Sequence, residues 1–176
     1  MNKIINFDEI RKVSKKISDV KSILKTVRIK DQTMIWTDSF FLIEIKNVDS
    51  PDMVINVDDY TINKGSYPNI EPIINHEFEY QKPESIIVYD NIVYKYHETD
   101  DLIYYIDKEI LDQLKRFVKP KFKILINLYD IMIAKNKTLC KLSLDENTTI
   151  YFSIRKGYKK RKKYEWVRII RSIKNH

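Results

Sequence analysis

Residues 102–118, LIYYIDKEILDQLKRFV, place a short apolar strand directly before an amphipathic helix. Leu102–Ile106 has strand character, Asp107 opens the helix and Pro120 ends it, because proline lacks the amide donor that a helix interior needs. The apolar side of the helix carries Ile110, Leu111, Leu114, Phe117 and Val118. Further β-rich runs follow at Phe122–Leu128, Ile131–Ala134, Thr138–Leu144 and Thr149–Ile154.

The first part of the chain has the same order of elements. A short strand is expected at Lys3–Phe7, and a helix is expected from Asp8, with Ile10, Val13, Ile17 and Val20 at helical spacing. Three strands are then expected at Thr26–Lys30, Thr33–Thr37 and Phe40–Lys46. The middle of the chain adds strands at Val54–Val57, Ser85–Tyr89 and Ile92–Tyr96. The sequence thus predicts an α+β fold of two β-α-β-β-β units, with two helices packed on one side of antiparallel sheets.

Three short segments resemble one domain of a DNA polymerase sliding clamp, the processivity fold, of bacterial or phage type. They are Trp36–Leu42 (WTDSFFL), Gly65–Ile74 (GSYPNIEPII) and Tyr105–Leu111 (YIDKEIL), and they occur in the order that the family shows. The resemblance spans residues 1–154 and implies a clamp-like domain followed by a basic C-terminal segment, 155–176. Bacterial clamp subunits carry three such domains and phage or eukaryotic ones two, whereas this chain has room for one.

Charge is distributed unevenly along the 176 residues. The net charge is +7, yet residues 155–176 hold ten basic and one acidic side chain, against 22 basic and 24 acidic in residues 1–154. A basic stretch of this kind is typical of a surface that neutralises phosphates and releases their counterions. A solubilising tail or a contact with a protein or membrane is the alternative. The predicted phosphate-binding residues here are Arg155, Lys156, Lys159, Lys160, Arg161, Lys162, Lys163, Arg168 and Arg171.

Both predicted helices carry cations opposite their apolar sides. These are Arg11, Lys12, Lys15 and Lys16 in the first helix and Lys108, Lys115 and Lys119 in the second. The resemblance implies that such helices line the hole of a clamp and hold DNA phosphates without reading bases. The alternative is ordinary, since solvent-facing helix sides are often rich in lysine.

Residues typical of catalysis or metal binding are sparse and scattered. Two glycines are too few for a phosphate-binding loop, and His76, His97 and His176 lack the spacing of a metal motif. Asp58 and Asp59 are adjacent, so on a strand they point to opposite faces. A lone Cys140 in a β-rich run is expected to be buried and inert. We therefore expect no enzyme activity, no metal and no cofactor.

The leading hypothesis is a cytoplasmic, clamp-like accessory protein that binds DNA or another nucleic acid in replication. A replication protein is a further expected partner, a homo-oligomer is left open, and no membrane contact is expected because no apolar run is long enough to span a bilayer. The alternative is a phage or mobile-element protein that inhibits a host nuclease, polymerase or clamp, and a small nuclease is a weaker third option. Abundant Ile, Asn, Lys and Tyr favour an AT-rich source such as a phage or a low-GC bacterium.

Overall fold

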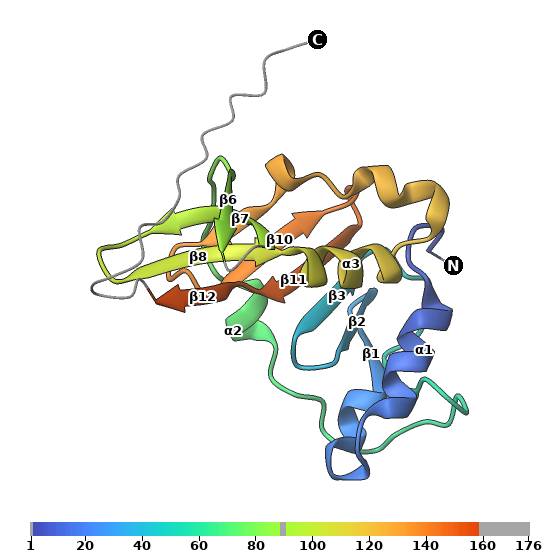
Figure 1. Ribbon diagram of the computed structural model, residues 1–176. Helices are drawn as coiled ribbons and strands as arrows, with labels where there is room; N and C mark the ends of the chain where they lie inside the picture. Colours follow the sequence, from blue (N-terminus) through green and yellow to red (C-terminus); the bar gives the residue numbers. More distant parts are fainter. Residues whose placement is uncertain (1, 89–90, 159–176) are drawn as a thin grey trace.

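The computed structural model describes residues 2–88 and 91–158 and has an α+β fold with two antiparallel sheets (Figure 1). In its first part, a helix is followed by a 3-10 helix and a three-stranded meander. Asp31 and Gln32 both have positive φ, 49° and 57°, which suits the two-residue turn of a tightly twisted hairpin. The elements are α1 (Phe7–Lys16), η1 (Asp19–Lys25), β1 (Thr26–Lys30), β2 (Thr33–Thr37) and β3 (Phe41–Ile45).

The later part of the chain repeats the sequence of helix, 3-10 helix and meander. Asp107 caps the helix, since its Oδ1 accepts a hydrogen bond of 3.0 Å from the amide of Ile110. The elements are β8 (Leu102–Asp107), α3 (Lys108–Phe117), η2 (Pro120–Leu125), η3 (Leu128–Asp130), β9 (Met132–Ala134), β10 (Leu139–Ser143) and β11 (Thr148–Ser153).

The two meanders join through their last strands. β3 pairs antiparallel with β11, with Ile43 opposite Ile150 and Phe41 opposite Phe152. One further strand lies at each outer edge, β4 (Met53–Asn56) beside β1 and β5 (Phe78–Tyr80) beside β9. The resulting order is β4-β1-β2-β3-β11-β10-β9-β5. Each half of the sheet thus consists of one outer strand followed by the three strands of a meander.

A smaller sheet is attached at the side of the second half. Its order is β12-β8-β7-β6, built from β6 (Glu84–Val88), β7 (Asn91–Glu98), β8 and β12 (Arg155–Tyr158). The predicted basic segment, 155–176, therefore begins with a strand of this sheet, and its residues from 159 onward lie outside the described residues.

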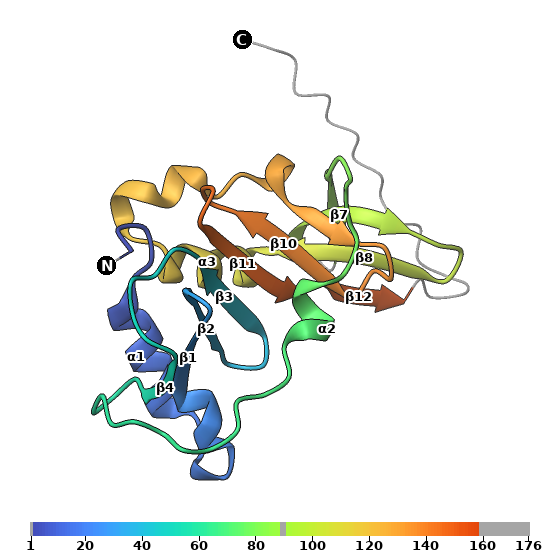
Figure 2. The same cartoon turned by 180° about the vertical axis from the view of Figure 1, so that it is seen from behind.

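Both long helices cover the same face of the large sheet (Figures 1 and 2). Trp36 on β2 donates its indole N–H to Ser14 Oγ on α1, at 3.1 Å, and its ring lies 5.4 Å from that of Phe117 on α3. Phe41 on β3 also contacts the Phe117 ring. The alternate side chains of β2 and β3 thus form the core beneath both helices.

The opposite face of the large sheet is covered by the connection between the halves. The short helix α2 (Glu71–Ile74) and its flanking residues lie there, with Ile70 fully buried against Ile35 and Leu42. The Tyr67 hydroxyl donates to the carbonyl of Ile35 at 3.2 Å, and burial raises the pKa of that phenol. The connection therefore buries the apolar side chains on this second face of the sheet.

Three sequence predictions are wrong in detail. Lys3–Phe7 is not a strand, and within it only Ile5 forms an isolated bridge, to Val118. The amides of Ile4 and Ile5 donate instead to the Asn2 side-chain oxygen, so they are not available to a strand ladder. The first helix stops at Lys16, since Ile17 is extended.

The third error concerns the residues after α3. Phe122–Leu128 was expected to be a strand but lies mostly in η2. Pro120 starts that 3-10 turn, and the amide of Phe122 donates to the carbonyl of Lys119 at 2.9 Å. The first unit therefore lacks a leading strand, and the second carries extra 3-10 turns.

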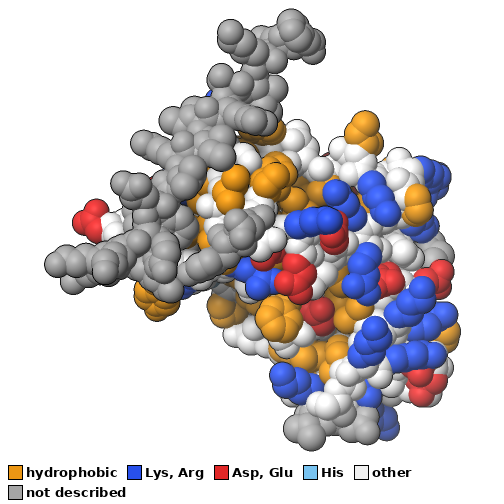
Figure 3. All heavy atoms as spheres, viewed as in Figure 1, with side chains coloured by type: hydrophobic (Ala, Val, Ile, Leu, Met, Phe, Trp, Pro, Cys, Tyr) orange, Lys and Arg blue, Asp and Glu red, His pale blue; other side chains and the backbone are white. Residues whose placement is uncertain are grey.

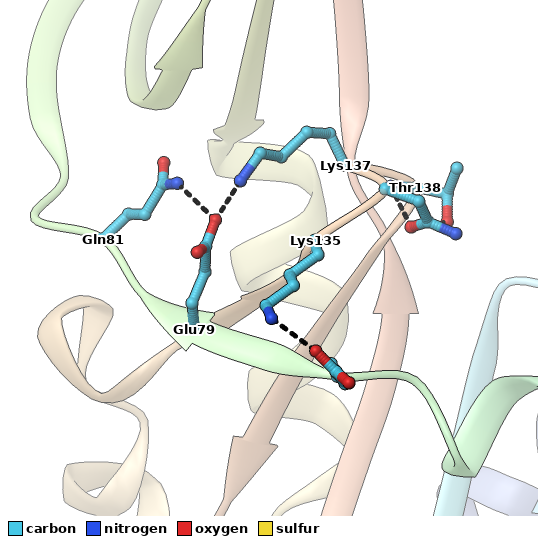
Figure 4. A network of polar contacts seen from close by, with 7 residues as sticks. Glu79, Gln81, Lys135, Lys137 and Thr138 are labelled. Atoms are coloured by element: carbon cyan, nitrogen blue, oxygen red, sulfur yellow. Dashed lines mark hydrogen bonds and ion pairs between the residues drawn. The ribbon is translucent and has the colours of Figure 1, made fainter.

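Ion pairs fasten the outer strand β5 to the residues that follow β9 (Figure 4). Lys135 pairs with Glu77, and Lys137 pairs with Glu79, whose carboxylate also accepts a hydrogen bond of 2.9 Å from Gln81. The Lys135 and Lys137 partners lower the pKa of Glu77 and Glu79 respectively. Ion pairs therefore add to the backbone hydrogen bonds between β5 and β9 at this edge of the sheet.

Candidate nucleic-acid interface

The fold brings the two predicted cation sets onto one surface. The first turn of α1 meets the last turn of α3, where the amide of Asn6 donates to the carbonyl of Phe117 at 2.8 Å. The amide of Lys119 likewise donates to the carbonyl of Ile4 at 2.9 Å. Figure 3 shows Lys and Arg side chains gathered over α1, α3 and η2 on this side of the molecule.

An ion pair crosses the junction of the two helices. Arg116, in the last turn of α3, donates through Nε to Glu9 Oε1 at 2.8 Å and through a second guanidinium nitrogen to the same oxygen. Glu9 lies in the first turn of α1 and is 8% exposed. Each charge also suits the dipole of its own helix, acid at the N-terminus and base at the C-terminus. Arg116 was not among the predicted site residues, and here it has a structural partner.

Five of the predicted helix cations are free to bind a ligand. In residues 2–88 and 91–158 they form no ion pair with an acidic side chain, and all are exposed except Lys119, which is half-buried. They are Lys12, Lys16, Lys108, Lys115 and Lys119.

The other two helix cations are engaged locally. Lys15 forms an ion pair of 3.0 Å with Asp58, in which both side chains are about half exposed. Arg11 donates through Nε to the carbonyl of Val57 at 3.4 Å and stacks over the Tyr60 ring at 5.3 Å. These two contribute charge to the surface, but their positions are held by the segment after β4.

Sequence reasoning missed the cations of η2. Lys121 and Lys123 are exposed there and extend the surface beyond the end of α3. The run Lys119-Pro120-Lys121-Phe122-Lys123 carried the signal, but a strand was expected from Phe122, so Lys121 and Lys123 were not grouped with the helix cations. Residues 7–16 and 108–125 together hold ten basic and four acidic side chains, so the face is net positive.

The C-terminal cations divide into two groups. Arg155 is neutralised within the fold, because its Nε lies 2.7 Å from Asp107 Oδ2 and a terminal nitrogen contacts Glu109. Lys156 lies over the Tyr104 ring at 5.7 Å and is exposed. The remaining predicted residues lie outside the described residues: Lys159, Lys160, Arg161, Lys162, Lys163, Arg168 and Arg171.

The described residues bring together no group of three or more His, Cys, Asp or Glu side chains suited to a metal ion. His76 lies beside Phe78, and His97 beside Tyr104 on the small sheet. Asp59 accepts hydrogen bonds from Thr61, which lower the pKa of its carboxyl. Cys140 is fully buried as predicted, and burial raises the pKa of its thiol.

No family model, curated protein or solved structure matches the chain. Among the helices that the structure describes, none has the length and apolar character to span a bilayer.

Proposed function

We propose that the protein is a non-enzymatic accessory protein that holds a nucleic acid on the surface formed by α1, α3 and η2. The observation that carries this proposal is that the first turn of α1 meets the last turn of α3, so that the free lysines of both predicted helices lie on adjoining elements. A row of cations on rigid helices suits a phosphate backbone, because each neutralised phosphate releases condensed counterions. The proposed contacts are made by lysines to phosphates, which carry no sequence information, so binding is expected to be largely independent of sequence.

The proposed role is clamp-like and linked to DNA replication. Two helix-then-meander units joined through β3 and β11, with both helices on one face, support this role. A single chain of this size would cover only one side of a duplex, so encircling DNA would need several copies. Light scattering after gel filtration, with and without duplex DNA, tests that part: a closed oligomer supports a clamp, and a monomer in both conditions contradicts it.

Two variants of equal charge test the proposed surface. The helix variant replaces Lys12, Lys16, Lys115 and Lys119 by Ser, and the control variant replaces four exposed lysines outside α1, α3 and η2, namely Lys30, Lys46, Lys64 and Lys82. Duplex binding is titrated at several salt concentrations. The salt slope is the slope of the logarithm of the binding constant against the logarithm of the salt concentration. The helix variant is expected to flatten it by about 0.9 per lost phosphate contact, and the control variant to leave it nearly unchanged. Equal slopes for both variants would refute the surface.

A third variant tests the contribution of the C-terminal segment. Replacing residues 159–163 (KKRKK) by Ser removes five adjacent cations, so the slope should flatten further if these contact phosphates. Single-stranded and duplex oligonucleotides are compared in the same experiment. If neither this variant nor the helix variant changes the slope, the cations serve a protein partner, which favours the inhibitor hypothesis.

A further inference from the structure

A cavity of about 270 Å³ opens between α1 and the outer edge of the large sheet. Its walls are almost entirely apolar and come from four elements and the turn after β4. We call it the α1 pocket, and its apolar lining consists of Phe7, Val27, Ile29, Met34, Ile55 and Val57. A pocket of this size suits one large side chain, since the pockets that hold drug-sized ligands measure about 300–1,000 Å³.

Arg11 and Tyr60 contact each other in the lining of the α1 pocket. Tyr60 is 66% exposed and has φ of 59°, a conformation that bulky L-residues seldom adopt. The guanidinium of Arg11 lies over its ring and is fixed at Nε by the Val57 carbonyl. Arginine has five N–H donors, and the remaining ones form no other bond within the described part of the chain. They are therefore placed to bind an anionic group at the rim.

The apolar walls favour an amino-acid side chain over a nucleobase. A base presents several donors and acceptors at its edge, and each one buried without a partner costs about 1–3 kcal/mol. Asn56 is the uncharged amide in the lining, and its Oδ1 already accepts the amide of Asp58 at 2.9 Å. A Phe or Leu side chain loses no hydrogen bonds on entering and gains about 1.5–3 kcal/mol by burial.

Charge at the rim defines the partner further. Asp8 is the acidic residue of the lining and lies in the first turn of α1, whereas from Arg11 to Lys16 the helix has four basic and no acidic side chains. A segment bound with its apolar residue in the pocket would meet this basic end of α1. Acidic residues flanking the apolar one complement that end.

We propose that the α1 pocket binds one large apolar side chain of an acidic protein segment, while Arg11 holds a carboxylate of the same segment. This inference goes beyond the proposed function and does not require nucleic-acid binding, because the walls of the pocket are apolar. Of the basic end of α1, Lys12 and Lys16 also belong to the free lysines.

Methyl NMR with a defined peptide tests the proposal. The probe is the peptide acetyl-EDSFSDE-amide, titrated into the full chain carrying labelled Ile, Val and Met methyl groups. Shifts are expected at Val27, Ile29, Met34 and Ile55, which line the pocket. Replacing the central Phe of the peptide by Ala should weaken binding at least about tenfold, as the loss of a buried large side chain requires.

Protein variants distinguish binding in the α1 pocket from non-specific attraction to the basic surface. Val57→Trp fills the cavity and should abolish the shifts, whereas Arg11→Ser should weaken binding and reduce its salt dependence. Tyr80→Ser, at an exposed site on β5, is the control and should bind as the parent does. Thermal melting checks that each variant is folded, and if Val57→Trp is unfolded, Arg11→Ser and the Ala peptide still decide the outcome.

Three results would overturn the proposal. One is the absence of methyl shifts at millimolar peptide. Another is equal binding of the basic peptide acetyl-KRSFSRK-amide. The last is stronger shifts of the same methyl groups with oligothymidylate, which would assign the pocket to an unpaired base.

Discussion

The two halves of the molecule use the same order of elements but stabilise their helices differently. α3 buries four apolar side chains and is capped by Asp107, whereas α1 buries Glu9, Ile10 and Ser14 and has no side-chain cap. α1 is instead held by partners in the other half or on the sheet, through the Glu9–Arg116 ion pair and the bond from Trp36 to Ser14. Local sequence signals therefore account for α3, whereas α1 depends largely on contacts with distant residues.

The largest expected effect is at the apolar face of α3. Phe117→Ala removes a ring that is 3% exposed and contacts both Trp36 and Phe41, so it should cost about 3–5 kcal/mol of unfolding free energy. Val13→Ala on α1, where the side chain is half-buried, should cost about 1 kcal/mol. Urea unfolding measures both. Similar losses for the two variants would contradict the difference between the helices.

The junction between the halves is expected to give the next largest effect. Arg116→Ala leaves the buried carboxylate of Glu9 without its partner and should cost about 1–3 kcal/mol. Glu9→Gln in the same chain should restore part of that loss, because a neutral amide is cheaper to bury than a charge. A double-mutant cycle measures the coupling, and a coupling of zero would mean that solvent already screens the pair.

Loss of the cap residue should also destabilise α3 more than α1, by a smaller difference in unfolding free energy. Asp107→Ala removes the acceptor for the Ile110 amide and should cost about 1 kcal/mol. Asp107→Asn keeps that acceptor and removes the ion pair with Arg155, so it separates the two roles. Asn6→Ala loses one exposed hydrogen bond to the Arg116 carbonyl and should cost about 0.5 kcal/mol. An Asn6 effect larger than that of Asp107 would reverse the comparison.

The smallest effect concerns pH and the outer strand β5. The Lys137 hydrogen bond lowers the pKa of Glu79 below its ordinary value of 4.5, so the unfolded chain binds more protons there in mild acid. Stability from this carboxylate is therefore full above pH 4.5 and is lost as pH falls through the lowered pKa. The Tm difference between the parent and Glu79→Gln should shrink to zero in acid. A Tm difference that persists there would show that the charge is not its source.

Sequence patterns predicted the second half better than the first. The apolar spacing in Ile110, Leu111, Leu114 and Phe117 and the cap at Asp107 are local signals, and the helix lies where they place it. Helical spacing continued through Ile17 and Val20, but α1 ends at Lys16, and the segment before it contributes only the single bridge of Ile5. Those boundaries depend on contacts with Val118 and the sheet, which no local pattern contains.

The candidate interface was predictable in its residues but not in its assembly. Lysines opposite the apolar sides of two helices were visible in the sequence, while the junction that places both helices on one surface arises from Glu9 and Arg116, 107 positions apart. Arg155 was predicted as a phosphate ligand, yet Asp107 and Glu109 neutralise it in the folded chain. The α1 pocket likewise collects residues from distant segments, so no local sequence pattern indicates it.

The most direct test of the account is a lysine protection experiment on the full chain. Acetylation of each lysine is measured by mass spectrometry with and without saturating duplex DNA at low salt. We expect a severalfold loss of reactivity at Lys12, Lys16, Lys108, Lys115 and Lys119. Unchanged reactivity is expected at Lys30, Lys46, Lys64 and Lys82. Protection spread evenly over both sets, or absent from the helix lysines, would contradict the proposed surface.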